Sequence, residues 1–137
     1  MKGWISKQMA NILIVEDDKD LNAAYKIILE SAKHHVKTAF NGVEALEILK
    51  DYKPDLILLD LLMPIMGGIE LLEHYELERH PKVKVLIFTN MENSPEVNKA
   101  YKLGATRCII KSWTAPQNLN KVINETLKEK TRVAASL

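Results

Sequence analysis

Four apolar stretches of this sequence each end in side chains that can do chemistry. The stretch 56–59 is followed by Asp60, and a loop with Pro64 and two glycines then carries the chain away. Short apolar runs bounded by turn residues indicate strands buried on both faces, as in parallel sheets. The other three stretches end in a similar way: 12–15 precedes Glu16 and Asp17, 83–88 precedes Thr89, and 107–110 precedes Lys111.

These strand ends would lie together in a parallel sheet, because the carboxyl ends of parallel strands share one edge where open α/β sheets bind ligands. The three acids Glu16, Asp17 and Asp60 would repel one another there unless a cation lay between them, and carboxylate oxygens suit Mg²⁺. A hydroxyl and an ammonium nearby suit a phosphoryl group. The pattern predicts a metal, a carboxylate nucleophile and donors to phosphate oxygens. An aspartate in this position is also a common turn residue, so Asp60 alone leaves both interpretations open.

Amphipathic helices are predicted between the strands. A fifth strand, 35–40, alternates between apolar and polar residues, as a strand with one wetter face does. Alternating strands and helices predict a single α/β domain, at about 11–130, whose parallel sheet carries helices on both faces. Apolar residues recur at helical spacing in five segments, at about 18–32, 42–52, 68–79, 95–103 and 116–127.

Composition excludes several classes of protein. The chain has 137 residues, 47% of them hydrophobic, and a formal net charge of +1, so no global field attracts nucleic acid or an anionic membrane. Its single cysteine excludes an internal disulfide framework, and no apolar run approaches the length of a membrane span. Residues 1–10 are expected to form an extension without the apolar core of a signal peptide, and 131–137 a short tail. A cytoplasmic location is the expectation. No chemistry is assigned to the histidines at 34, 35, 74 and 80.

The chain resembles the receiver domain of two-component response regulators, of the chemotaxis-regulator type. The motifs that carry the resemblance are Ile12–Asp18, Asp60–Pro64 with Gly68, Thr89 and Lys111, in this order on successive strands. The resemblance implies a flavodoxin-like fold with strand order 2-1-3-4-5. It also implies a role for each residue: Asp60 as phosphoacceptor, Glu16, Asp17, Asp60 and the carbonyl of Leu62 around Mg²⁺, and Thr89 and Lys111 on the phosphoryl oxygens.

The resemblance further implies partners. The phosphoryl group would come from a phosphohistidine of a sensor histidine kinase or phosphotransfer protein, and Asp60 could pass it on within a phosphorelay. Because little chain follows the last helix, the output is expected to be contact with another protein, as a monomer or weak homodimer, without direct binding to nucleic acid or a membrane. The domain would assist its own phosphorylation and dephosphorylation without being a dedicated enzyme. The alternative is a receiver-shaped interaction module that works without phosphorylation.

Several positions depart from the family pattern. Ser112 follows the lysine where the family usually has proline after a cis bond, and a trans Lys111–Ser112 bond is expected because a cis bond before other residues costs about 3 kcal/mol. Cys108 replaces a common aromatic residue, whose role would be lost or supplied by another ring such as Trp113. Asn90, and apolar Leu62 and Met91, suggest a long-lived aspartyl phosphate that loads poorly from small donors.

Two other classes of protein share parts of this pattern. A flavodoxin-like FMN protein needs a phosphate loop rich in Ser, Thr or Gly after the first strand, and residues 16–18 are all acidic there. A phosphatase of the haloacid-dehalogenase type places its nucleophile after the first strand, with a second Asp two residues on. Here the candidate nucleophile follows the third strand, and Leu62 lies two residues on. A turnover assay with a generic phosphate ester would distinguish such a phosphatase from a receiver domain.

Overall fold

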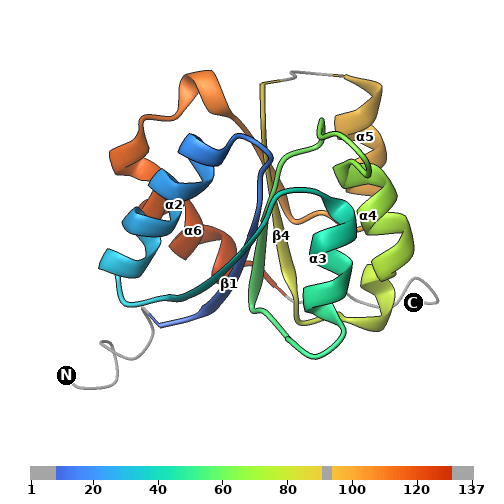
Figure 1. Cartoon of the computed structure of the whole chain (residues 1–137), viewed down its shortest axis with the longest axis horizontal. Helices are drawn as coiled ribbons and strands as arrows, with labels where there is room; N and C mark the ends of the chain where they lie inside the picture. Colours follow the sequence, from blue (N-terminus) through green and yellow to red (C-terminus); the bar gives the residue numbers. More distant parts are fainter. Residues whose placement is uncertain (1–8, 91–93, 131–137) are drawn as a thin grey trace.

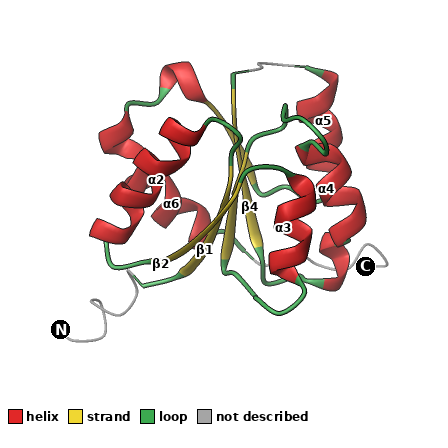
Figure 2. Cartoon of the chain, in the orientation of Figure 1, coloured by secondary structure: helices red, strands yellow, loops and turns green. Residues whose placement is uncertain are grey.

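A computed structural model describes residues 9–90 and 94–130, and Figures 1 and 2 show an open sheet between two layers of helices. The strands are β1 (Asn11–Val15), β2 (His35–Ala39), β3 (Leu56–Leu59), β4 (Lys84–Thr89) and β5 (Arg107–Ile110). The α-helices are α2 (Lys19–Ser31), α3 (Gly42–Leu49), α4 (Gly68–Tyr75), α5 (Pro95–Lys102) and α6 (Leu119–Leu127).

The five strands form one parallel sheet in the order β2-β1-β3-β4-β5, which confirms the predicted fold class and order. β3 is the central strand, and the order reverses between β1 and β3. Helices α2 and α6 cover one face of the sheet, and α3, α4 and α5 cover the other (Figure 1). Each strand is thus followed by a helix that returns the chain to the same edge, so every strand enters the sheet in the same direction.

Alternation along the strands divides the core into two layers. On β1, Leu13 and Val15 face the α3–α5 layer, whereas Ile12 and Ile14 face the α2–α6 layer. The four residues of β3 are almost completely inaccessible to solvent, as expected for a strand buried on both faces. Each buried leucine or isoleucine side chain contributes about 1.5–3 kcal/mol relative to exposure. The central strands are therefore firmly packed and hold the residues at their ends in place.

The helix ends follow the sequence signals with three exceptions. Asp18, Asn41 and Ser94 each cap a helix by accepting backbone N–H groups with their side chains. The predicted third helix is too long: α4 stops at Tyr75 because Glu76 adopts a left-handed conformation with φ 59°, and a separate 3-10 turn, Leu77–Arg79, follows. The second helix also ends earlier than predicted, at Leu49, and a 3-10 turn at Pro116–Asn118 precedes α6.

The Lys111–Ser112 peptide bond is trans, as expected for a bond before serine. The predictions for most of the extension 1–10, for Met91, for the tail 131–137 and for the side chain of Trp113 concern groups outside the described part of the structure. In the part of the chain that the structure describes, no helix has the length and apolar character needed to cross a bilayer.

His34 is a buried polar residue at the opposite end of the sheet from the acidic strand ends. Its ring is 4% exposed and lies between the end of α2 and the start of β1. The Nδ1 atom accepts a hydrogen bond of 3.0 Å from the backbone N–H of Ala10, so the ring is neutral with its proton on Nε2. Burial lowers the pKa of His34 below its ordinary value of 6.5. Protonation would break the bond to Ala10.

The pH dependence of stability tests this role of His34. Because the folded-state pKa lies below that of the unfolded chain, the stabilisation is complete above pH 6.5 and declines as the pH falls toward the folded-state pKa. We expect His34→Asn, whose Oδ1 can replace Nδ1 as acceptor, to remove this decline, whose slope reaches at most about 1.4 kcal/mol per pH unit. Urea unfolding between pH 5 and 8 measures it.

The control for this experiment is His35→Asn, at the exposed neighbouring position, which should leave the decline in place. If His34→Asn retained the same decline below pH 6.5, another group would be responsible and the assignment to His34 would be wrong.

Candidate functional site

The register of the sheet places Glu16 beside Asp60. Val15 of β1 pairs with Leu59 of β3, so the next residue of each strand lies at the carboxyl edge. The backbone N–H of Asp60 donates to the carbonyl of Val15 over 3.0 Å. This bond extends the ladder by one residue and fixes the backbone of Asp60 against the end of β1. The two carboxylates are therefore held by the sheet itself.

Glu16, Asp60 and Lys111 lie on the same face of the sheet by alternation. Glu16 continues the α2–α6 side of β1, and Asp60 continues that side of β3. Lys111 follows β5 and reaches across β4 to both acids. Its Nζ donates to Asp60 Oδ2 over 3.1 Å and to Glu16 Oε1. All three side chains are largely buried, so these ion pairs are screened much less than surface pairs.

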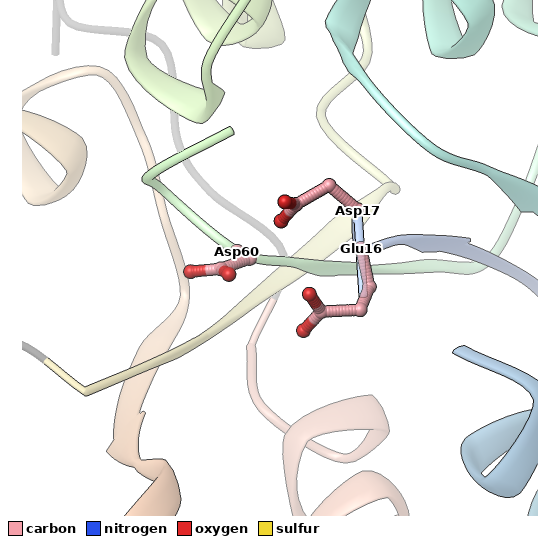
Figure 3. A group of neighbouring side chains, drawn as sticks. All are labelled: Glu16, Asp17 and Asp60. Carbon is pink, nitrogen blue, oxygen red and sulfur yellow. The ribbon is translucent and has the colours of Figure 1, made fainter. Parts of the chain in front are cut away.

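Asp17 completes an acidic cluster with Glu16 and Asp60. One carboxylate oxygen from each residue lies within 4.8 Å of the other two, and Figure 3 shows Asp60 beside Glu16 and Asp17, which follow β1. Three ionised carboxylates and the Lys111 ammonium have a formal charge of −2, which one divalent cation would neutralise. Oxygen donors at this spacing suit a hard ion such as Mg²⁺. The residues present therefore fit the predicted metal.

Burial and the ion pairs shift the pKa values of Glu16 and Lys111. Burial raises the pKa of Glu16 above its ordinary value, although the Lys111 hydrogen bond, the N–H of Asp18 and the Lys111 charge act in the opposite direction. Burial alone would lower the pKa of Lys111, but hydrogen bonds and charge from Glu16 and Asp60 outweigh it and raise the pKa. Lys111 is thus a fixed positive charge at neutral pH.

The acidic residues after β1 have separate positions. Asp18 is the N-cap of α2 and accepts the backbone N–H groups of Asp20 and Leu21. The backbone N–H of Asp18 in turn donates to Glu16 Oε2 over 3.0 Å. Asp18 therefore caps the helix, whereas Asp17 lies in the cluster.

Thr89 ends β4 and pairs with Ile110 of β5 at the same edge of the sheet. It is buried, and alternation places it on the α3–α5 side with Val85 and Ile87. Leu62 lies in the loop two residues beyond Asp60, with its side chain 60% exposed. Both residues thus lie at or next to the predicted edge, and their roles on phosphoryl oxygens and Mg²⁺ stay predictions.

Close backbone contacts hold the loop that follows Asp60. The N–H of Gly42, at the start of α3, donates to the carbonyl of Met66 over 2.8 Å. A Cβ on residue 42 would lie 2.6 Å from Met66 Cγ, 2.8 Å from its Sδ and 2.9 Å from its carbonyl oxygen. A Cβ on residue 68 would lie 2.7 Å from the carbonyl oxygen of Asp60. Because neither glycine has a side chain, the loop can lie close to the start of α3 and to the backbone of Asp60.

Gly42, Met66 and Asn22 were not among the predicted functional residues. Asn22 is buried on α2, and its side chain donates to the carbonyls of Glu16 and Ala39. One signal was available for Asn22: it is a polar residue on the stripe that also contains Tyr25 and Leu29, where an apolar residue is expected. The contact of Gly42 with Met66 joins segments distant in the sequence, and no local pattern indicates it.

Cys108 is half-buried and packs against the α3–α5 core layer. Burial raises the pKa of its thiol. On the neighbouring helix, Tyr101 is 46% exposed, and burial of the remainder of its side chain raises the pKa of its hydroxyl. Cys108 therefore fills its position as a small apolar residue, and the loss of the aromatic role, or its supply by another ring such as Trp113, stays a prediction.

Comparison with known proteins identifies the family. A sequence model described as the response regulator receiver domain matches residues 12–124. The chain belongs to the response regulator receiver domain family. This assignment replaces the two competing interpretations, an FMN protein and a dehalogenase-type phosphatase. Receiver proteins of this type are not dedicated enzymes.

Individual receiver proteins resemble the chain over most of its length. It is 32% identical to the chemotaxis protein CheY of Halobacterium salinarum over 111 residues, 81% of this chain and 92% of that protein. A solved CheY-like receiver protein from Methanospirillum hungatei superimposes with a TM-score of 0.80 at 30% identity, over 87% of this chain and 94% of that one. The Regulator of RpoS of Escherichia coli is 36% identical over 100 residues, and the match spans 73% of this chain but only 29% of that longer protein.

The contact between Gly42 and Met66 generates a prediction about the loop of the receiver site. We expect Gly42→Ala to lower the free energy of unfolding by about 1–3 kcal/mol through overpacking, even though alanine is the better helix former by about 0.5–1 kcal/mol. In Gly42→Ala/Met66→Ala the loss should be smaller than the sum of the two single losses, because the Met66 Cγ and Sδ contacts are gone. Urea unfolding of the four proteins gives the coupling energy.

Val43→Ala is the matched control, since Val43 is the next residue of the same helical turn and is exposed. Its effect should stay within about 0.5 kcal/mol. Additive losses in the double variant would show that Met66 does not limit the space at residue 42.

Proposed function

We propose that this protein is a response regulator that accepts a phosphoryl group on Asp60 in a Mg²⁺-dependent reaction and signals by contact with another protein. The observation that carries the proposal is the arrangement around Asp60. Lys111 is bonded to Asp60 and Glu16, and Asp17 completes an acidic cluster of the size that a metal ion requires. Receiver domains take part in two-component signalling with histidine kinases, so a phosphohistidine of a sensor kinase or phosphotransfer protein is the proposed donor.

In the proposed reaction a carboxylate oxygen of Asp60 bonds to phosphorus while the N–P bond of the phosphohistidine breaks. The electron pair of that bond leaves with the imidazole nitrogen, and an acyl phosphate remains on Asp60. Bound Mg²⁺, held by Glu16, Asp17, Asp60 and the Leu62 carbonyl, would neutralise charge on the phosphoryl oxygens. Lys111 and the Thr89 hydroxyl would donate to the same oxygens after transfer.

The ion pairs of Lys111 support this role. Its ammonium is held at the carboxylate that would be modified, and its raised pKa keeps it charged. A phosphoryl group on Asp60 would offer Lys111 new oxygens with more negative charge than the carboxylate. Loading Asp60 would thus change the partners of a residue at the end of β5.

The output surface is proposed to be the face formed by α5, β5 and α6. All four residues of β5 are half-buried, and Tyr101 of α5 is partly exposed beside them. The strand that provides Lys111 therefore also reaches the surface. A partner protein docked there would contact the element that carries the state of Asp60.

A receiver-shaped module that works without phosphorylation is the second candidate. Three departures favour it: Cys108 in place of an aromatic residue, Ser112 after the lysine, and Asn90 after Thr89. The intact arrangement of Glu16, Asp60 and Lys111 opposes it.

Beryllofluoride with Mg²⁺ separates the two candidates, because it occupies a phosphoacceptor carboxylate as a phosphoryl mimic. We expect saturating amounts to stabilise the protein by about 2.7 kcal/mol at one hundred times the dissociation constant, which is several degrees in the melting temperature. Asp60→Asn should abolish the shift, whereas Asp55→Asn, at the opposite end of β3, should retain it. No shift in the unaltered protein would favour the module that works without phosphate.

The lifetime of the aspartyl phosphate is a separate prediction. Leu62 is exposed beside the site and cannot orient water, so we expect hydrolysis half-lives well above seconds. Leu62→Gln should shorten the half-life several-fold, and Ile65→Gln, at a more exposed position of the same loop, should not. Loss of ³²P from the labelled protein measures both. A half-life of seconds in the unaltered protein would contradict the prediction.

A further inference from the structure

Asn22 is a polar residue in an apolar position. Its side chain lies on the buried stripe of α2 with Tyr25 and Leu29 and is 2% exposed. A leucine there would bury apolar area without the cost of dehydrating an amide, which is about 1–3 kcal/mol when no hydrogen bond compensates it. The hydrogen bonds of the amide must therefore account for the presence of asparagine at this position.

The amide of Asn22 joins the ends of two strands. Its Nδ2 donates to the carbonyl of Glu16 over 2.9 Å and to the carbonyl of Ala39 over 3.1 Å. The backbone N–H of Glu16 also donates to the carbonyl of Ala39, over 3.1 Å. The end of β1, the end of β2 and the second turn of α2 thus share one small network.

This network fixes the peptide unit between Glu16 and Asp17. The carbonyl of that unit belongs to Glu16 and is held by Asn22, and its N–H belongs to Asp17. The two soft torsions that flank this unit are ψ of Glu16 and φ of Asp17, and changing them would alter the directions in which the two carboxylates leave the backbone. Glu16 and Asp17 supply two of the three acids of the cluster, so Asn22 controls the direction from which two acids reach the same space.

We propose that Asn22 is a positioning residue for Mg²⁺: it orients the Glu16–Asp17 peptide unit so that both carboxylates face Asp60. This inference rests on the proposed function, which supplies the metal. Asn22 lies behind the backbone of the cluster and acts on the ion through that backbone. Loss of a group that orients metal ligands commonly lowers affinity by about 10–100-fold.

Calorimetric titration with Mg²⁺ alone, on full-length protein without a phosphodonor, tests the proposal. We expect Asn22→Ala to raise the dissociation constant at least about tenfold. Asn22→Leu, which fills the space without donating, should have the same effect, and it remains available if the alanine variant does not fold.

Leu29→Ala is the control, because it removes a fully buried side chain from the same stripe of α2, nearer the other end of the helix. It should lower stability at least as much as the Asn22 variants and leave the dissociation constant within about twofold. Urea unfolding without Mg²⁺ ranks the stabilities, so a loss of affinity that merely follows instability would appear in this control as well.

The outcomes separate the two proposals. If the unaltered protein binds Mg²⁺ and either folded Asn22 variant binds it equally well, the positioning role is wrong and the proposed function stands. A comparable loss of Mg²⁺ affinity in Leu29→Ala would also overturn the positioning role. If the unaltered protein does not bind Mg²⁺, the proposed function itself fails, and the inference fails with it.

Discussion

Repulsion among three carboxylates at one sheet edge is the constraint on which the rest of the site depends. Glu16, Asp17 and Asp60 each place one carboxylate oxygen within 4.8 Å of the other two, and burial makes the charge on Glu16 costly, as its raised pKa indicates. Lys111 offsets part of that charge through two ion pairs. The N–H of Asp18 provides a further donor to Glu16. What is left is a negative site that favours a divalent cation.

The sheet can support such a site because its strands are buried on both faces. β1, β3 and β4 are almost completely enclosed by apolar side chains, so their ends have little freedom to move apart. Glu16 and Asp60 are the first residues beyond two of these strands, and each still takes part in the ladder through its N–H. Charges that repel are therefore held by backbone hydrogen bonds and by the hydrophobic core, and the cluster does not have to be stable by itself.

Local patterns were sufficient to predict the strands and the residues at their ends. Apolar runs at 12–15 and 56–59 indicate buried strands, and a parallel sheet brings their ends together whatever the loops do. The end of α4 was not predictable in this way, because buried Leu77 continues the apolar pattern past the left-handed Glu76. The contacts of Asn22 and of Gly42 with Met66 depend on how distant segments meet, and the acceptor role of His34 depends on the approach of Ala10.

The division of the site between the two faces of the sheet connects it with the proposed output surface. Glu16, Asp60 and Lys111 continue the α2–α6 side, whereas Thr89 continues the α3–α5 side. A phosphoryl group contacted by both Lys111 and Thr89 would therefore act on both layers at once. Lys111 follows β5, the strand whose residues are all only half-buried. A change at Asp60 would accordingly be transmitted most easily along β5, through the backbone between Cys108 and Lys111.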